Sequence, residues 1–183
     1  MELKRVVVTG LGAITPLGND VDTTWEAAVA GKSGAAPITH FDASKFKTQF
    51  ACEVKNFNAA DHFDRRKARQ LDLYAQYALV AARQAVADSG MEEAQNLDKN
   101  RVGVIIAAGI GGLHTFEEEA GYYAMHEDQG PKYNPFFIPK MIADIASGHV
   151  SMEYGYHGPN FGVVSACASS TVSYTHLTLP TIR

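Results

Sequence analysis

One cysteine stands in a setting that suits a nucleophile. Cys167 lies among small residues in the segment SACASS, residues 165–170, and directly follows the mostly apolar run of residues 160–166. A nucleophile on a tight strand-to-helix turn needs small neighbours, because the backbone passes close on both sides. A helix N-terminus there would favour the thiolate, and the adjacent N–H can hold an oxyanion. The alternative is a buried structural cysteine, and the local pattern alone leaves both interpretations open.

A second candidate site is basic. Residues 65–69 read RRKAR at the start of a helical pattern, where positive charge opposes the helix dipole by about 0.3–1 kcal/mol per charge. Arg65, Arg66 and Arg69 can dock an acidic partner. The alternative is a solvated helix start, which the local sequence favours when taken alone.

The glycines, the histidines and the second cysteine suggest no cofactor or metal site. Gly10 and Gly12, like the run GIGG at 109–112, lack the spacing of a dinucleotide-binding loop. They are predicted to serve tight turns or close backbone contacts. Cys52 is expected to be a buried structural residue. The seven histidines show no metal-ligand spacing, and none is identified as a base for Cys167.

Composition excludes several functional classes. The 183 residues carry 16 Lys+Arg against 20 Asp+Glu, a net charge of −4, which excludes a nucleic-acid binder that works by bulk positive charge. No run of 18 apolar residues is present, so no membrane span is expected. The N-terminus lacks the pattern of a signal peptide, and two distant cysteines indicate no disulfide framework, so a cytoplasmic location is expected.

Alternating strands and helices predict an α/β fold with a mostly parallel sheet. Apolar runs predict buried strands over residues 5–12, 101–108 and 160–166, with a strand-like stretch at 50–57. Helical spacing predicts helices over residues 21–30, 67–89, 113–126 and 140–154. The first of these would be capped by Asp20 or Asp22 and would bury Trp25 and Val29.

Five stretches together resemble the β-ketoacyl-acyl-carrier-protein synthases, and specifically their elongating type II branch. They are VVVTGLGAITPLG (6–18), RRKAR…LD…Y (65–77), RVGVIIAAGIGG (101–112), YNPFFIPKMIADIASGHVS (133–151) and GPNFGVVSACASST (158–171). The resemblance implies a thiolase-like fold of αβαβα layers and a homodimer. It also implies a condensing acyltransferase without metal or redox cofactor, whose partner is acyl carrier protein.

The resemblance assigns roles to particular residues. It makes Cys167 the acyl-accepting nucleophile and backbone oxyanion donor, and it places Ile110 on the acyl pocket. Phe136 and Phe137 fall in the segment near the dimer side of that pocket, and Arg66 and Arg69 fall in the carrier-protein docking patch. The loaded acyl chain would be condensed with malonyl-acyl-carrier-protein, with loss of CO2, to give a 3-oxoacyl product.

The chain also departs from the family. Members are more than twice as long, and their two catalytic histidines and a lysine lie in a C-terminal half that this sequence does not contain. Residues 1–171 are expected to be the N-terminal part of the fold, truncated within its first half, and to expose apolar sheet surface. Residues 172–183 look like the translation of a sequencing adapter. The fragment itself is expected to be inactive; the alternatives are a polyketide-type ketosynthase subunit and a non-catalytic fragment that binds acyl carrier protein.

Overall fold

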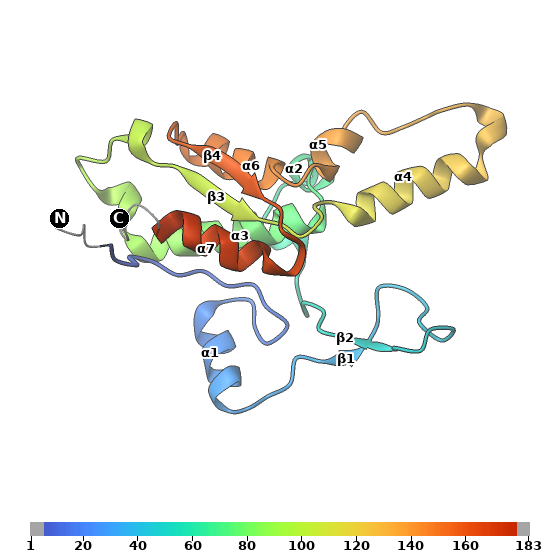
Figure 1. The fold of residues 1–183 in the computed structure, drawn as a ribbon, viewed down its shortest axis with the longest axis horizontal. Coiled ribbons are helices and arrows are strands. Elements are labelled where there is room, and N and C mark those ends of the chain that lie inside the picture. The colour runs from blue at the N-terminus through green and yellow to red at the C-terminus, as the bar shows by residue number, and fades with distance from the viewer. Residues whose placement is uncertain (1–5, 179–183) are drawn as a thin grey trace.

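The computed structural model describes residues 6–178. Its centre is an α/β body, from which a helical arm and a small lobe project (Figure 1). The arm consists of α4 (Leu113–Met125) and its connection to α5 (Phe137–Met141). The lobe contains α1 (Val21–Val29) and the antiparallel pair β1 (Ala36–Pro37) and β2 (Phe50–Ala51). Single 3₁₀ turns are η1 (Ala59–Asp61), η2 (Met91–Glu93), η3 (Lys99–Arg101), η4 (Glu127–Gln129) and η5 (Ala166–Ala168).

The body is built on a parallel pair of strands, as the sequence predicts. β3 (Val104–Ala107) pairs with β4 (Asn160–Val163) in a register that sets Val104 opposite Asn160. α6 (Ile145–Tyr154) covers one face, since a Cβ on Gly162 would lie 2.8 Å from the Cα of Asp144, just before α6. α7 (Ser169–Thr178) covers the other face, where the rings of Phe161 and His176 meet at 5.9 Å. The result is a three-layer α–β–α arrangement.

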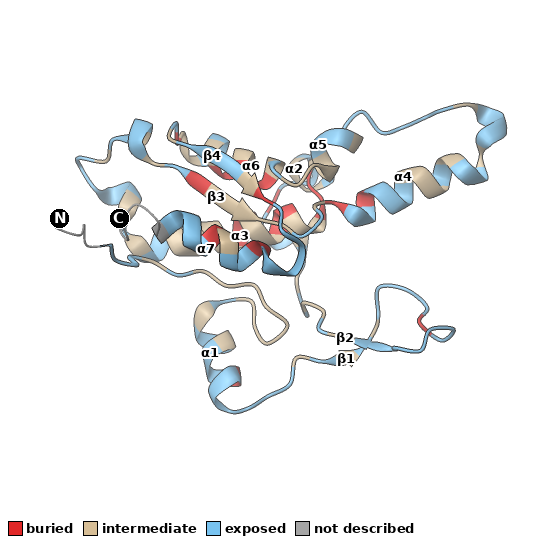
Figure 2. Cartoon of the chain, viewed as in Figure 1, coloured by how far each residue is buried: buried red, intermediate tan, exposed pale blue. Residues whose placement is uncertain are grey.

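The hydrophobic core lies on one side of this sheet. α3 (Leu73–Ser89) packs against α6, and Leu79 is fully buried between them and β3. The other side is more open (Figure 2). Phe161 is 40% exposed and Val164 57% exposed there. Apolar surface therefore lies exposed beside the sheet, as the sequence predicts.

The predicted helix over residues 67–89 is wrong in one respect, because it is two helices. α2 (Arg65–Gln70) ends at Leu71, whose ψ of 133° is extended, and α3 begins after Asp72. The Asp72 side chain caps α3 by accepting from the N–H of Tyr74. The predicted helix over 140–154 is likewise divided into α5 and α6, with an extended Ile142 between them. Its carbonyl accepts from the Tyr74 hydroxyl at 2.5 Å.

The predicted strand over residues 5–12 is also wrong within the described residues. No strand is assigned to residues 6–12, and Val6, Val7 and Val8 are more than half exposed. Side chains of α3 bind this segment instead: Asp88 accepts from the N–H of Leu11, and Gln84 accepts from the N–H of Ala13. Its backbone hydrogen bonds therefore go to helix side chains rather than to a neighbouring strand.

Two further details of the lobe differ from expectation. The strand-like stretch at residues 50–57 contributes only the two residues of β2. α1 is capped by Asp20, as predicted, but Trp25 and Val29 are 68% and 69% exposed. Ala27 is the buried residue of this helix, because the lobe offers no surface large enough to cover the bigger side chains.

Candidate active site

Cys167 lies on the turn that joins β4 to α7. It belongs to η5, which continues directly into α7, and its thiol is free and exposed. The structure therefore places this cysteine at the start of a helix, beyond the C-terminal end of a parallel strand, as the small-residue pattern predicts. α7 runs on to Thr178 and so includes the described part of the segment 172–183; residues 179–183 lie outside the described residues.

The turn is held in an unfavourable backbone conformation. Ala166 has a φ of +47°, and among residues 6–178 the only other non-glycine residue with a positive φ is Asn56. The left-handed region costs a residue such as alanine about 1–2 kcal/mol. Such strain persists only where surrounding contacts impose it, and it is concentrated at functional sites.

An open cavity of about 590 Å³ lies beside this turn. Its lining includes Ile110, which is 66% exposed, and Ser170, three residues beyond Cys167. The remaining walls come from the N-terminal segment, α3 and the end of β3. The structure thus brings the predicted pocket residue and the first turn of the cysteine helix to one cavity with largely apolar walls.

The loop that carries Ile110 is tightly fixed. Gly111 has a φ of +94°, and a Cβ there would lie 2.5 Å from the Met141 carbonyl oxygen. Only glycine suits this position, because both the conformation and the space exclude a side chain. The N–H of Gly112 donates to the same carbonyl at 2.9 Å. Glycines 111 and 112 therefore serve close backbone packing, as predicted.

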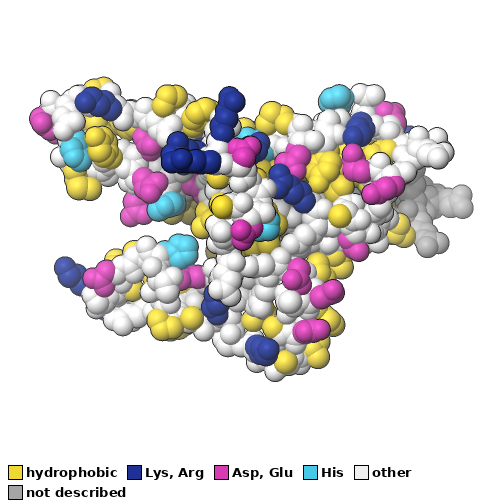
Figure 3. Space-filling view, turned by 180° about the vertical axis from the view of Figure 1, so that it is seen from behind, with side chains coloured by type: hydrophobic (Ala, Val, Ile, Leu, Met, Phe, Trp, Pro, Cys, Tyr) yellow, Lys and Arg dark blue, Asp and Glu magenta, His cyan; other side chains and the backbone are white. Residues whose placement is uncertain are grey.

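The basic residues form a second surface feature. Arg66 and Arg69 are exposed on α2 and line a cavity of about 500 Å³ with Arg65, Gln70 and Phe136. No carboxylate within residues 6–178 lies within 4.0 Å of these guanidinium groups. Figure 3 shows Lys and Arg side chains gathered near the base of the α4 arm, the part of the molecule that contains α2 and α5. These arginines are therefore available to an external anionic group.

The two phenylalanines that the sequence singles out do not act together. Phe136 is 43% exposed and borders the arginine cavity. Phe137 turns to the arm, where its ring stacks on Phe116 at 6.3 Å and on Tyr133 at 5.5 Å. The structure therefore separates a surface aromatic beside the basic residues from one that packs α5 against α4.

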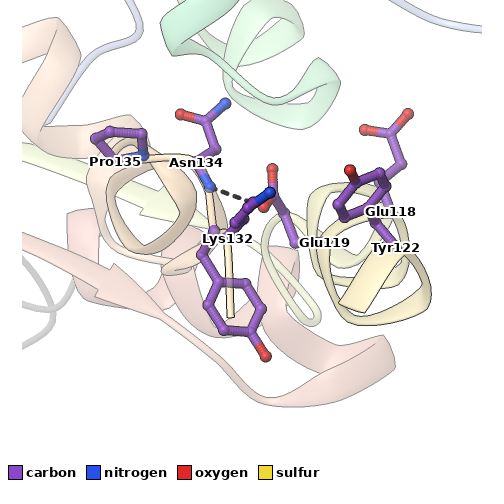
Figure 4. A pocket seen from close by; sticks show the side chains of 7 residues that line it. Glu118, Glu119, Tyr122, Lys132, Asn134 and Pro135 are labelled. Atoms are coloured by element: carbon purple, nitrogen blue, oxygen red, sulfur yellow. Dashed lines mark hydrogen bonds between the residues drawn. The ribbon is translucent and has the colours of Figure 1, made fainter. Parts of the chain in front are cut away.

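A third cavity, of about 830 Å³, lies along the arm and not at Cys167. Its lining residues are drawn in Figure 4 and are Glu118, Glu119, Tyr122, Lys132, Tyr133, Asn134 and Pro135. The N–H of Asn134 donates to Glu119, which fixes the connection after α4. Cys167 is not among its lining residues, and α4, which carries three of them, projects away from the β4–α7 turn in Figure 1.

The remaining cysteine and the histidines are placed as follows. Cys52 is exposed, so the expectation of burial is wrong; β2 beside it has only two residues and pairs with β1 alone among the described strands. None of the seven histidines, all within residues 6–178, hydrogen-bonds to Cys167. His149 is half-buried, its Nε2 has no partner there, and its Nδ1 lies 3.4 Å from the Lys67 ammonium.

Other sites are absent from the part of the chain that the structure describes. Residues 6–178 contain no group of three His, Cys, Asp or Glu side chains placed to hold a metal ion. Within the same range, no helix combines the length and the apolar character that crossing a membrane requires.

Two residues near the candidate site escape the sequence patterns. Ser169 is 4% exposed, and its hydroxyl bridges both sides of Ala166, accepting from the N–H of Ser165 at 2.8 Å and donating to the Ala166 carbonyl at 2.7 Å. Asp72 is 5% exposed and binds Thr115 at the start of α4. The sequence could have indicated Asp72, because it stands between a basic segment and an apolar helical pattern, where N-capping residues occur. Ser169 could not have been found in this way, because a serine within a run of small residues follows no such pattern.

Comparison with known proteins places this geometry in a family. The model of the family described as Beta-ketoacyl synthase, N-terminal domain, matches residues 3–183. A 3-oxoacyl-[acyl-carrier-protein] synthase 2 from Staphylococcus aureus (strain COL) is 47% identical over 171 residues, which are 93% of this chain and 40% of that protein. The protein of the same name from Coxiella burnetii (strain RSA 493 / Nine Mile phase I) is 46% identical over 176 residues, 96% of this chain and 42% of its own length.

Solved structures show the same fold. The ishigamide ketosynthase/chain length factor superposes with a TM-score of 0.77 at 27% identity, covering 98% of this chain and 45% of that one. A type II PKS acyl-carrier protein in complex with its ketosynthase gives 0.73 at 23% identity, covering 96% and 46%. The chain thus spans less than half the length of the proteins it matches. It has the ketosynthase, thiolase-like fold over that part, and it belongs to the β-ketoacyl synthase family, whose N-terminal domain it matches.

Proposed function

We propose that this chain supplies the nucleophile of a condensing acyltransferase that elongates fatty acyl chains on acyl carrier protein. The observation that carries the proposal is the exposed thiol of Cys167 on a strained turn at the start of α7, beside the cavity lined by Ile110. The relatives at 46–47% identity are named 3-oxoacyl-[acyl-carrier-protein] synthase 2, which states this reaction for them.

The first half-reaction would load the cysteine. The Cys167 sulfur attacks the carbonyl carbon of an acyl thioester, a new C–S bond forms, and the carrier protein leaves as its thiol with the proton. Negative charge builds on the former carbonyl oxygen in the transition state. The N–H of Cys167 has no acceptor within residues 6–178 and is therefore free to donate to that oxygen.

The second half-reaction would form the carbon–carbon bond. Malonyl-acyl-carrier-protein loses CO2, and the electron pair of the broken bond passes to the neighbouring carbon. This carbon attacks the acyl-cysteine carbonyl, the C–S bond breaks, and Cys167 leaves as the thiolate, which takes up a proton from water to restore the thiol. The product is a 3-oxoacyl chain two carbons longer. The histidines of this chain do not contact Cys167, so the proposal places the acid–base groups elsewhere in the complete enzyme.

The other predicted residues take binding roles in the proposal. Ile110 is one apolar wall for the alkyl chain. Arg66 and Arg69, with Phe136 beside them, are the surface for an acidic carrier protein; a solved relative carries such a carrier protein bound to its ketosynthase. Phe116 and Tyr122 of α4 and Ile138 of α5 are exposed, which supports a homodimer contact through the arm. Both cysteines are free, which agrees with a reducing cytoplasm.

Sequence identity favours this function over a polyketide-type ketosynthase subunit. Identity is 46–47% to the 3-oxoacyl synthases but 23–27% to the two polyketide-type structures. A non-catalytic fragment that binds acyl carrier protein would need the arginine surface but not the thiol. Replacing Cys167 therefore distinguishes this function from that of a condensing enzyme.

The deciding experiment is acyl transfer to the complete enzyme that carries this sequence. The enzyme is mixed with octanoyl-acyl-carrier-protein and analysed by intact-mass and peptide mass spectrometry. One octanoyl group on Cys167 is expected, Cys167→Ala should abolish it, and the exposed Cys52→Ala is the matched control that should retain it. Acyl transfer that survives Cys167→Ala would overturn the proposal, and carrier binding without acylation would identify a binding protein.

A further inference from the structure

The hydroxyl of Ser169 forms hydrogen bonds with the backbone on both sides of the Ala166 Cα, in the residue that precedes Cys167 and in Ser165. It accepts from the N–H of Ser165 at 2.8 Å and donates to the carbonyl of Ala166 at 2.7 Å. Its one donor and one of its two acceptor lone pairs are thus used within the turn. Ser169 is 4% exposed, so water does not compete effectively for these bonds.

Ala166, the residue between these two hydrogen bonds, has the unfavourable backbone conformation of the turn. Ala166 sits at φ +47° and has only a methyl group, so it cannot stabilise this conformation with its own side chain. Two backbone bonds also cross the turn: the N–H of Ala168 donates to the carbonyl of Ser165 at 3.0 Å, and the N–H of Ser169 donates to the carbonyl of Ala166. The buried hydroxyl therefore adds to these backbone bonds, and it is the only side chain among them.

Holding the Ala166 carbonyl also orients the next N–H. The peptide bond between Ala166 and Cys167 is planar and trans, so its carbonyl and its N–H point in opposite directions. The Ser169 hydroxyl and the Ser169 N–H both donate to this carbonyl oxygen, so the Cys167 N–H must point away from Ser169. This is the N–H group that has no acceptor within residues 6–178.

We propose that Ser169 is a positioning residue that aims the backbone N–H of Cys167 at the oxyanion formed during acyl transfer. Ser169 does not touch the substrate; it acts through the Ala166–Cys167 peptide. The inference depends on the proposed function of Cys167. It differs from a purely structural role of Ser169, which would change stability without changing the rate of acyl transfer.

Two reactions of the same thiol separate these roles. Acylation by octanoyl-acyl-carrier-protein passes through an oxyanion, whereas alkylation by iodoacetamide does not. In the complete enzyme, Ser169→Ala should lower the rate of acylation about tenfold to a hundredfold, because loss of one oxyanion donor costs about 100-fold to 1,000-fold and here the donor is misdirected rather than removed. Its alkylation rate should stay within about threefold of the parent enzyme. Ser169→Thr keeps the hydroxyl and should retain most of the acylation rate.

Ser147 supplies the matched control. It is 0% exposed, and its hydroxyl also makes two hydrogen bonds, with Asp144 and Asn160, neither of which belongs to the turn at residues 165–169. Ser147→Ala should lower the melting temperature while the acylation rate of the folded enzyme is unchanged. If Ser169→Ala does not fold, Ser169→Cys takes its place, since a thiol keeps the volume but hydrogen-bonds weakly.

Each outcome decides the inference. Equal acylation rates in Ser169→Ala and the parent enzyme, with Cys167→Ala inactive, would overturn the positioning role and leave the proposed function intact. A parallel fall in acylation and alkylation would overturn it as well, because the thiol itself would then be disturbed. Acylation that persists in Cys167→Ala would instead refute the proposed function.

Discussion

The carboxylate of Asp72 accepts two hydrogen bonds from Thr115, which lies 43 positions further along the chain. The Thr115 N–H donates at 3.1 Å and its hydroxyl at 2.5 Å. Both residues are buried, and Gly112 packs so closely that a Cβ there would lie 3.0 Å from the same carboxylate. This contact joins the start of α3 to the start of α4 and so fixes one end of the loop that carries Ile110.

Removing the Thr115 hydroxyl should therefore destabilise the fold. Thr115→Val is expected to lower the free energy of unfolding by about 1–2 kcal/mol, because it leaves a buried carboxylate oxygen with one partner fewer. Thr115→Ser keeps the hydroxyl and should lower the free energy of unfolding by a smaller amount. Urea denaturation measures both changes, with the exposed Thr48→Val as control. A loss in Thr115→Val no larger than in Thr48→Val would contradict the prediction.

Two glycine substitutions should have opposite effects on stability. A Cβ on Gly12 would lie 1.9 Å from the Ala81 carbonyl oxygen, so Gly12→Ala must push the N-terminal segment away from α3 and should cost about 1–3 kcal/mol. Gly121 lies inside α4 with nothing within 4 Å of the added atom, so Gly121→Ala should stabilise by about 0.5–1 kcal/mol. Melting temperatures would test both predictions: an unchanged or higher value in Gly12→Ala would show the close contact to be wrong, and a lower value in Gly121→Ala would contradict the open position in α4.

The local sequence pattern was enough to predict several helices and strands of this fold. The apolar run at 101–108 predicts β3, the run at 160–166 predicts β4, and helical spacing predicts α4 almost to the residue. In each case neighbouring residues decide the conformation. The five motif stretches predict the family, which the family match confirms.

Contacts between distant residues decided the rest. Residues 5–12 are predicted to be a buried strand, but the side chain of Asp88 accepts from the N–H of Leu11, and that of Gln84 accepts from the N–H of Ala13 just after the predicted strand. No local sequence pattern indicates these contacts with α3. The break at Leu71 likewise depends on the buried Asp72–Thr115 contact. At the candidate site, small residues around Cys167 predict the turn, whereas the buried hydroxyl that holds it depends on the folded geometry. The chemical role of Cys167 stays a prediction until acyl transfer is measured.

His149 should make stability depend on pH. Burial lowers the pKa of its imidazole, the nearby Lys67 ammonium lowers it further, and Glu153 opposes these effects. The unfolded chain, with a pKa of about 6.5, then takes up a proton before the folded chain does. The stabilising contribution is therefore complete above about pH 6.5 and falls as the pH drops toward the lower folded-state pKa.

Replacing this histidine should remove that part of the pH dependence. The difference in unfolding free energy between pH 7.5 and pH 5.5, measured in urea, should be smaller in His149→Gln than in the parent protein. The exposed His157→Gln is the control and should keep the parent difference. An unchanged difference in His149→Gln would show that its imidazole titrates alike in both states.

The final prediction concerns the arginine surface, for which charge reversal separates binding from chemistry. Arg66 and Arg69 face solvent without a carboxylate partner in the described residues, so they are expected to attract an acidic carrier protein at long range. The double variant Arg66→Glu/Arg69→Glu should raise KM for acyl-carrier-protein about tenfold or more at low salt, with kcat largely retained. This difference from the parent should shrink as salt screens the charges. The double variant Lys47→Glu/Arg101→Glu reverses two exposed charges elsewhere on the surface and changes the net charge by the same amount, so it is the control for net charge alone. Iodoacetamide alkylation of Cys167 should not change, because neither arginine of α2 lies on the turn. An equal rise in KM with Lys47→Glu/Arg101→Glu would assign the effect to net charge and not to this surface.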